Sequence, residues 1–349
     1  MRIETTLPLG DWRAVGPAAR RAEELGFDGI TSPEIANDPF VPLAFAALAT
    51  ERIRLGTAIA VAFPRSPMVV ANLAWDLQKN SRGRFALGLG PQVKGHNERR
   101  FGVPWGPPVP RLREYVESLR AIWRCWEKRE PLRYEGAHYR FTLMTPEFSP
   151  PPSGLPPVPV TIAAVGKDML KLAGRVCDGV RLHGFCTRRY LEELALPQLR
   201  AGLEQSGRDR RRFEIWGGGF IATGRDADEV ARQVEWTRYR IAFYGSTRTY
   251  SRVLSLHGWD ELAARLHEMS KRGQWNEMAA QISDEVVHEF VAVAPYDQLV
   301  GAVEKRFGGL VDAIAIGFPE DTPPGLAREL LQDLRRIPHA FEGFPATWG

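Results

Sequence analysis

Short apolar runs alternate with longer amphipathic stretches along almost the whole chain. The apolar runs predict strands near residues 2–7, 30–31, 54–60, 84–89, 158–163, 179–182, 214–222 and 313–317. Patterns of helical period follow several of them, at 11–25, 67–79, 111–127 and 226–243. Regular strand–helix alternation indicates parallel strands, and about eight such units predict an α/β fold closed into a (β/α)8 TIM barrel. A doubly wound open sheet is the main alternative.

A recurring local pattern supports the repeated unit. Glycine, a few apolar residues and an aspartate precede predicted strands at 26–28, 174–178 and 308–312. Asp11 is suited to cap the first helix, and Gly26 stands where a left-handed residue ends it. The pattern therefore reads as an internal repeat.

We expect one barrel domain over residues 1–338, with insertions at about 131–159 and 245–289. Both segments are longer than a barrel requires and are typical of lids or interfaces. A tail at 339–349 carries the aromatics Phe341, Phe344 and Trp348. We expect it to dock on its own barrel or on a neighbour's, and we expect a homodimer or higher homo-oligomer.

The composition indicates a globular protein and argues against some classes of function. The 349 residues are 44% hydrophobic and 25% charged, which is typical of a globular protein. A net charge of only +4 argues against nucleic acid as a partner. The three cysteines have no C-x-x-C spacing and fit a reducing cytoplasm. No apolar run approaches the ~18 residues of a membrane span, and we expect no signal peptide.

Polar residues after predicted strands are the candidates for chemistry, because ligands of parallel α/β folds bind at the carboxyl ends of strands. They are Glu34, Asn37 and Asp38 after the second strand, Gln92, His96 and Asn97 after the fourth, and His183 after the sixth. Each also has a structural interpretation as a helix cap, an ion-pair partner or a hydrogen-bonded histidine. No H-E-x-x-H motif or ligand cluster occurs, so we expect no catalytic metal.

Two glycine-containing stretches suggest where a cofactor lies. The fourth strand contains Gly88 and Gly90, which leave room for a flat group to approach the backbone, although their spacing does not fit G-x-G-x-x-G. After the fifth strand, Val165 and Gly166 precede a helix that begins at Lys167. Free N–H groups at such a helix start bind phosphate, unless this is only a tight connection.

Several motifs together carry a family resemblance. They are ELGFDGI at 24–30, ERIRLGTAIAVAFPRSP at 51–67, GRFALGLG at 83–90 and AAVGKDMLKLAGRVCDGVRLH at 163–183. In this combination and order, the chain resembles the luciferase-like superfamily of flavin and deazaflavin oxidoreductases from residue 3 to about 338. Within it, the chain most resembles the branch that uses coenzyme F420.

The resemblance implies a cofactor site. A bulge with a non-prolyl cis peptide, near Ala60 and Val61, would lie behind the deazaflavin ring. Backbone at Val165 and Gly166, with Lys167, would hold the phosphate, and Gly88, Gly90, Gln92 and Asn97 would complete the cofactor site. Arg65, Arg99, Arg100, Lys167 and Lys171 would suit a polyglutamate tail, or are ordinary surface cations.

The resemblance also implies a substrate pocket, with one departure from the family pattern. Members often have Asp-His after the second strand, where this chain has Pro33–Glu34. Glu34, beside the apolar Ile35 and Phe40, would then be the general acid or base. Asn37, Asp38, His96 and His183 would line the pocket.

The implied activity is hydride transfer between F420 and a small organic substrate. Three alternatives stay open. One is an FMN-dependent monooxygenase on the same barrel, and another is a non-catalytic flavin-binding protein of this fold, which the missing Asp-His favours. A glycosidase would need a second carboxylate opposite Glu34, and the sequence offers no convincing one.

Overall fold

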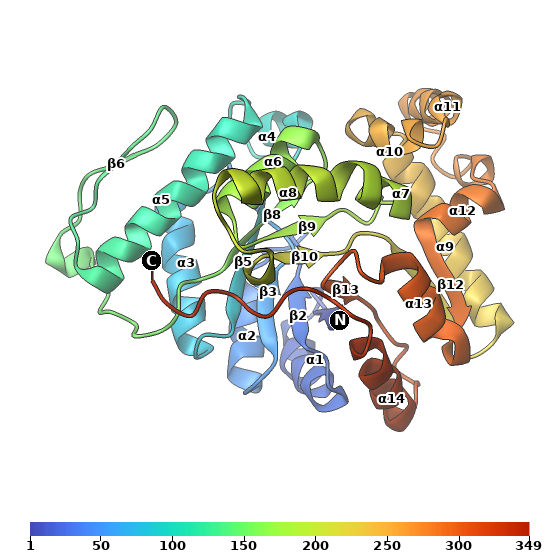
Figure 1. Cartoon of the computed structure of the whole chain (residues 1–349), viewed down its shortest axis with the longest axis horizontal. Helices are drawn as coiled ribbons and strands as arrows, with labels where there is room; N and C mark the ends of the chain where they lie inside the picture. The colour runs from blue at the N-terminus through green and yellow to red at the C-terminus, as the bar shows by residue number, and fades with distance from the viewer. Residues whose placement is uncertain (349) are drawn as a thin grey trace.

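The computed structural model describes residues 1–348, and its centre is a closed barrel of eight parallel strands (Figure 1). The strands are β1 Arg2–Thr6, β2 Gly29–Ser32, β3 Arg54–Thr57, β5 Phe85–Gly90, β8 Val160–Ala164, β9 Gly179–Leu182, β10 Glu214–Trp216 and β13 Ala313–Ala315. They follow one another around the barrel in the order β3-β2-β1-β13-β10-β9-β8-β5, and β3 pairs with β5 to close it. The predicted TIM barrel is confirmed, and the doubly wound alternative is wrong.

Helices surround the barrel. Those beside the strands are α1 Trp12–Leu25, α2 Val41–Ala49, α3 Pro67–Asn80, α5 Pro108–Lys128, α6 Lys167–Val176, α8 Leu196–Gln205, α13 Leu299–Phe307 and α14 Pro324–Arg335. The start and stop of α1 follow the sequence signals: the Asp11 carboxylate accepts from the Arg13 amide, and Gly26 ends the helix at φ 98°. The predicted capping of this helix is confirmed.

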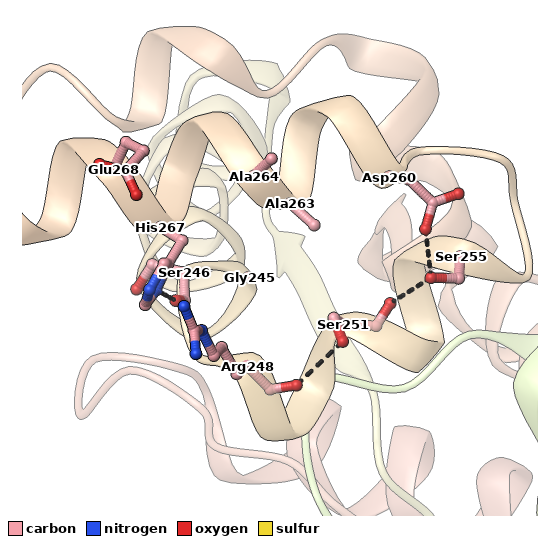
Figure 2. Close-up of a pocket in the computed structure, with 10 residues that line it drawn as sticks. All are labelled: Gly245, Ser246, Arg248, Ser251, Ser255, Asp260, Ala263, Ala264, His267 and Glu268. Atoms are coloured by element: carbon pink, nitrogen blue, oxygen red, sulfur yellow. Dashed lines mark hydrogen bonds between the residues drawn. The ribbon is translucent and has the colours of Figure 1, made fainter.

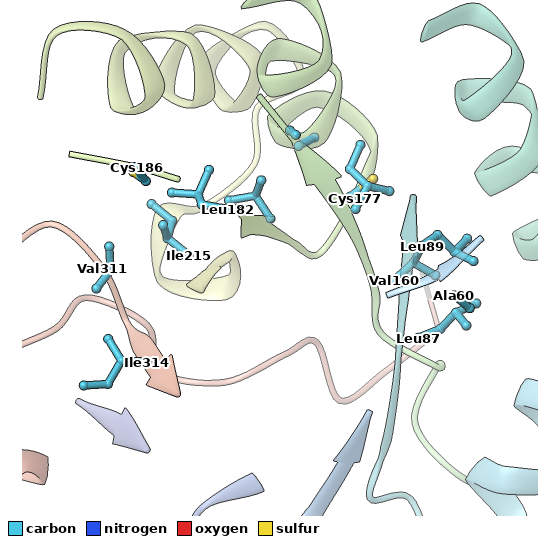
Figure 3. Packing of buried hydrophobic residues seen from close by; sticks show 14 of the residues in the cluster. Ala60, Leu87, Leu89, Val160, Cys177, Leu182, Cys186, Ile215, Val311 and Ile314 are labelled. Atoms are coloured by element: carbon cyan, nitrogen blue, oxygen red, sulfur yellow. The ribbon is translucent and has the colours of Figure 1, made fainter. Parts of the chain in front are cut away.

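Side chains alternate between the barrel interior and the helical layer. Glu4 of β1 and Arg181 of β9 form a buried ion pair at 3.1 Å across non-adjacent strands, so both point inward. Their neighbours Ile3 and Leu182 therefore face the helices, where Leu182, Ile215 and Ile314 pack with other buried aliphatic residues (Figure 3). The barrel interior therefore contains charged side chains, and an apolar layer lies between the strands and the surrounding helices.

A second inward carboxylate, Glu214, extends this charged interior. Arg2 and Arg54 donate to its Oε1 at 2.9 and 3.0 Å. The Arg181 guanidinium lies 5.4 Å from the centre of the Trp216 ring. Burial raises the pKa of both Glu4 and Glu214, against the opposing effect of the arginines. These ion pairs hold the amino-terminal half of the barrel together.

The strand predicted at 214–222 is two strands in the structure, because the chain turns out of the barrel after Trp216. It continues as β11 Phe220–Gly224, which pairs in parallel with β12 Val291–Pro295 outside the barrel. Glycines permit the turn: a Cβ on Gly218 would lie 1.9 Å from the His183 carbonyl oxygen, and Gly219 has φ 127°. Strand β12 was not predicted.

The two predicted insertions carry structure of their own. Within 131–159, β6 Tyr134–Glu135 and β7 Arg140–Phe141 form an antiparallel hairpin. Between β11 and β12 lie α9 Ala227–Gly245, α10 Ser251–Ser255, α11 Asp260–Lys271 and α12 Asp284–Phe290, which form a lobe at one side of the barrel (Figure 1). The two short helices α4 Lys94–Arg99 and α7 Arg188–Tyr190 follow β5 and β9. The domain boundaries themselves stay a prediction.

The tail docks on its own barrel at the amino-terminal ends of the strands. The Ala340 and Phe341 amides donate to Asp312 Oδ1, just before β13, at 3.1 and 3.0 Å. Phe341 is buried, and Trp348 Nε1 donates to the Leu155 carbonyl at 2.9 Å. Docking on the chain's own barrel is confirmed, while Gly349 lies outside the described residues. Within residues 1–348, no helix combines the length and hydropathy that crossing a bilayer requires.

Candidate active site at the barrel mouth

Glu34 links two loops at the carboxyl ends of the strands. It follows β2, and its Oε2 accepts a 2.7 Å hydrogen bond from the Val61 amide and a 2.8 Å bond from Arg65 Nη1. Arg65 Nη1 also reaches Oε1 at 3.0 Å, and the Glu34 side chain is only 6% exposed. Its immediate partners are thus a guanidinium and an amide, whereas Ile35 points into solvent. The carboxylate has a positioning role, and its catalytic role stays a prediction.

The bulge after β3 contains a non-prolyl cis peptide between Ala58 and Ile59. The predicted cis peptide near Ala60 and Val61 is confirmed: it directly precedes these two residues, which form the short strand β4 that pairs with Leu89 and Gly90 of β5. The bulge is held from the side of β2: the Ala58 amide donates to the Ser32 carbonyl at 3.0 Å, and the Ile59 carbonyl accepts from the Glu34 amide at 3.2 Å. Glu34 therefore holds the bulge through both main chain and side chain.

Gly88 and Gly90 make room for the protein's own groups. A Cβ on Gly88 would lie 2.1 Å from the Thr57 carbonyl oxygen, and one on Gly90 would lie 2.7 Å from Ile59 Cδ1. Close packing within the barrel thus explains both glycines without a ligand. Their contact with a cofactor remains a prediction.

The loop after β5 is fixed by Asn97. This residue is buried on α4, and its Nδ2 donates to the carbonyls of Pro91 and Val93 at 2.9 and 3.1 Å. Within residues 1–348, Asn97 Oδ1 has no hydrogen-bond partner. Gln92 adopts φ 58° and accepts from the Val93 amide, while His96 is exposed on the same short helix.

Asp38 and Asn37 serve local structure after β2. Asp38 Oδ1 accepts from the amides of Phe40 and Val41 at the start of α2, at 2.8 and 3.1 Å. Its Oδ2 accepts from Arg65 Nη2 at 3.0 Å, so Arg65 bridges Glu34 and Asp38. Asn37 Nδ2 donates to the Leu9 carbonyl at 3.0 Å. Arg65 is therefore engaged by two carboxylates, and its side chain is not a free cation.

The start of α6 is arranged as the sequence indicates for an anion site. Gly166 is the N-cap residue, and no side chain caps the helix. Gly166 and Lys167 are exposed, and a Cβ built on Gly166 would meet nothing within 4 Å. The Val165 carbonyl accepts a hydrogen bond from the Tyr190 hydroxyl, which fixes the loop just before the helix. Uncapped N–H groups and open space in front of them suit a phosphate.

His183 lies across the mouth from Glu34, because β9 and β2 are opposite strands of the barrel. Its Nδ1 accepts from the Phe185 amide at 3.0 Å, so in the neutral ring the proton resides on Nε2. Burial, with a smaller contribution from Arg240, lowers the pKa of His183 to about 4. The imidazole is therefore neutral at physiological pH.

Three residues near His183 were not predicted from the sequence. The rings of Tyr250 and Tyr244 lie 4.5 and 4.3 Å from the imidazole, centre to centre, and Arg240 Nη2 donates to the Tyr244 hydroxyl at 2.5 Å. Arg240 and Tyr244 are four residues apart on α9, a spacing that brings them to one helix face. That pairing was readable from the sequence, but its position beside His183 was not.

A separate cavity of about 360 Å³ opens in the lobe between α9, α10 and α11 (Figure 2). Its polar groups largely satisfy one another: Ser255 Oγ donates to Asp260 Oδ1 at 2.5 Å, and His267 Nδ1 contacts the Ser246 carbonyl at 2.9 Å. None of the predicted site residues lines it. In the part of the chain from 1 to 348, no group of three or more His, Cys, Asp or Glu residues is placed to hold a metal.

Comparison with known proteins decides the family. A family model described as luciferase-like monooxygenase matches residues 2–313. This chain belongs to the luciferase-like family. It is 46% identical over 336 residues to the uncharacterized protein Rv1360 of Mycobacterium tuberculosis, covering 96% of this chain and 98% of that protein. It is also 27% identical over 307 residues to 5,10-methylenetetrahydromethanopterin reductase of Archaeoglobus fulgidus, covering 85% and 87% of the two chains.

Solved structures share the fold of this luciferase-like protein. The coenzyme F420-dependent tetrahydromethanopterin reductase of Methanopyrus kandleri superposes with a TM-score of 0.75 at 21% identity, covering 96% of this chain and 97% of that one. The oxygenating constituent of 3,6-diketocamphane monooxygenase from Pseudomonas putida, in complex with FMN, has a TM-score of 0.69 at 16% identity and covers 97% of each chain. The same fold thus occurs in an F420-dependent reductase and in an FMN-binding monooxygenase.

Proposed function

We propose that this luciferase-like protein is a coenzyme F420-dependent oxidoreductase that transfers a hydride between the deazaflavin and a small organic substrate. The observation that carries the proposal is the uncapped start of α6, which opens at the mouth of a barrel of this family. The kinship with 5,10-methylenetetrahydromethanopterin reductase favours F420, since the enzyme of that class from Methanopyrus kandleri is F420-dependent.

The residues at the mouth fit such a cofactor. The N–H groups at the start of α6, with Gly166 and the exposed Lys167, would hold its phosphate, and Lys171 extends the positive charge along the same helix. The bulge at Ala58–Ile59 would support the ring from behind, because Ser32, Glu34 and Gly90 fix it in place. When bound, the deazaflavin supplies the redox chemistry, and the protein supplies binding, orientation and exclusion of water.

Glu34 is the proposed proton-exchanging group. Its carboxylate lies at the mouth, where the Val61 amide and Arg65 fix its orientation. Asn37, Asp38, His96 and His183 would border the substrate, with His183 on the side of the mouth opposite Glu34. A cytoplasmic location and a homo-oligomeric state belong to the same proposal.

A titration tests the cofactor. Purified protein would be titrated with F420 and with FMN, followed by fluorescence and by the shift in melting temperature. Gly166→Glu would place a carboxylate in the open space at the helix start, and we expect it to weaken F420 binding at least tenfold. Gly301→Glu, on α13 where space is also open, is the matched control and should bind like wild type. Absence of binding by both cofactors would refute the proposal.

The second candidate is an FMN-dependent monooxygenase, which the description of the matching family favours. Preference for FMN in the titration, together with oxygen consumption when reduced flavin is supplied, would establish it. Cofactor binding without turnover over a broad substrate panel would instead support a non-catalytic flavin-binding protein.

A further inference from the structure

A cluster of hydrogen-bond donors lies beside the sixth barrel strand. It consists of His183, directly after β9, together with Arg240, Tyr244 and Tyr250 from the lobe, and we call it the His183 cluster. The Tyr250 ring stacks on the imidazole at an angle of 26°, and the Tyr244 ring meets it edge-on at 82°. Arg240 lies over Tyr244 and Trp236, with its guanidinium carbon 5.0 and 5.4 Å from the two ring centres. Aromatic contacts on several sides thus fix the donors.

The cluster has more donors than acceptors. His183 Nδ1 is occupied by the Phe185 amide, which leaves Nε2–H as a donor. Within residues 1–348, His183 Nε2, the Tyr250 hydroxyl and Arg240 Nε and Nη1 make no hydrogen bond, and the Nε of Arg240 is fully buried. In that same part of the chain, no carboxylate lies within 4 Å of the Arg240 guanidinium. An arginine without an acidic partner, among unused donors, calls for an explanation.

The charges around the cluster favour an anion. Besides burial, the positive charge of Arg240 lowers the pKa of His183. Besides burial, Tyr244 raises the pKa of Tyr250. A cationic ligand would be repelled by Arg240, while an apolar ligand would cover the accessible donors His183 Nε2, Arg240 Nη1 and the Tyr250 hydroxyl without giving them a partner. An oxyanion such as a carboxylate or a phosphate group can accept from the guanidinium and also from the imidazole and the phenol.

The cluster keeps accessible surface close to the carboxyl end of β9. His183, Arg240, Tyr244 and Tyr250 are all half-buried, so each retains surface that a ligand can contact. Strand β9 lies next to β8, whose following loop leads into α6. A ligand at the cluster would therefore sit beside the proposed phosphate site and across from Glu34.

We infer that the His183 cluster binds a carboxylate or phosphate group of the substrate, so that the substrate of this protein is an organic anion. The assignment of that anion to the substrate rests on the proposed function. The same chemistry at this place could come from an acidic group of the cofactor, and the experiment separates the two sources.

The first arm measures anion binding without cofactor. Wild type would be titrated with benzoate and with inorganic phosphate at constant ionic strength, followed by isothermal titration calorimetry. We expect saturable binding of at least one anion, with affinity reduced tenfold or more by Arg240→Gln and reduced less by Arg240→Lys. The matched control is Arg232→Gln, an exposed arginine of the same helix, which should bind as wild type does. Absence of saturable binding to wild type, or equal affinity in Arg240→Gln and Arg232→Gln, would overturn the inference.

The second arm distinguishes substrate from cofactor. F420 and FMN would be titrated against wild type and Arg240→Gln, with the melting temperature of each variant confirming that it folds. Cofactor affinity unchanged within about twofold, with anion affinity lost, supports a substrate site. A tenfold loss of cofactor affinity would assign the cluster to the cofactor and overturn the inference. Tyr250→Phe removes one donor but keeps the ring, so it should lower the affinity for the anion by a smaller factor than Arg240→Gln does. Failure of the proposed function would appear separately, as absent cofactor binding by wild type.

Discussion

Arg65 binds Glu34 from the loop after β4, with Nη1 at 2.8 and 3.0 Å from the two carboxylate oxygens. The pair joins the loop after β2 to the loop after β4, and the Tyr115 hydroxyl fixes Arg65 from behind by donating to its carbonyl at 3.0 Å. Because Glu34 is 6% and Arg65 18% exposed, this ion pair is largely shielded from water. It is therefore a largely buried link between two loops of the candidate site.

Removing Arg65 should destabilise the protein. Arg65→Met leaves the shielded Glu34 carboxylate with only the Val61 amide, and we expect a loss of about 3 kcal/mol in the free energy of unfolding. Urea denaturation measures it. The control Arg82→Met removes an exposed pair with Glu51 and should change stability by less than about 0.5 kcal/mol. The double variant Glu34→Gln/Arg65→Met should be more stable than Arg65→Met alone, because no unpaired carboxylate remains. If the destabilisations of the two single variants simply add in the double variant, this explanation is contradicted.

Glu34→Gln should lower turnover about 10²-fold or more if Glu34 exchanges the proton. The amide oxygen still accepts from the Val61 amide, so we expect F420 affinity to stay within about threefold of wild type. Steady-state rates over a substrate panel and a parallel cofactor titration give the two values. Asp38→Asn, which also touches Arg65, is the control for disturbance of the ion pair. Near-normal turnover of Glu34→Gln would reduce Glu34 to a positioning residue.

How far the sequence predicts this structure depends on the range of each interaction. Strand–helix units and the caps of α1 are local patterns, and they could be read directly. The exit of the chain after Trp216 could not, because it depends on Gly218 packing against the His183 carbonyl, 35 positions earlier in the chain. Strand β12 was not predicted because its partner β11 lies far from it in sequence.

In the candidate site, too, local features were predictable from the sequence and long-range contacts were not. Position after a strand was enough to select Glu34, Asp38 and His183 as residues at the mouth. Their partners were not predictable, because Arg65 and Tyr250 reach them only once the barrel has closed and the lobe has packed beside it. We expected Ile35 to give Glu34 apolar surroundings, and this was wrong for the same reason. Ile35 points into solvent, and Arg65, which is distant in sequence, contacts the Glu34 carboxylate instead.

Stability should fall as the pH decreases from about 6.5 to 4 because of His183. Burial and Arg240 lower its folded-state pKa to about 4 from the usual 6.5, so in this range the unfolded chain binds a proton that the folded chain does not. This linkage amounts to up to about 3 kcal/mol at the acidic end. His183→Asn keeps an acceptor for the Phe185 amide and should flatten the slope, as measured by urea denaturation at several pH values. A variant slope equal to that of wild type would contradict the shift.

The tail should stabilise the barrel without touching the site, because it covers the amino-terminal ends of the strands. Phe341 is 3% exposed there and packs under the Arg2 guanidinium, 4.7 Å away, so Phe341→Ala should lower the free energy of unfolding by about 3 kcal/mol. Glu342→Ala, at the exposed neighbouring position, should stay within about 0.5 kcal/mol of wild type. Cofactor affinity of the folded Phe341→Ala protein should be unchanged, since the mouth is at the opposite end of the barrel. Loss of binding without loss of stability would show that the tail reaches the site in another way.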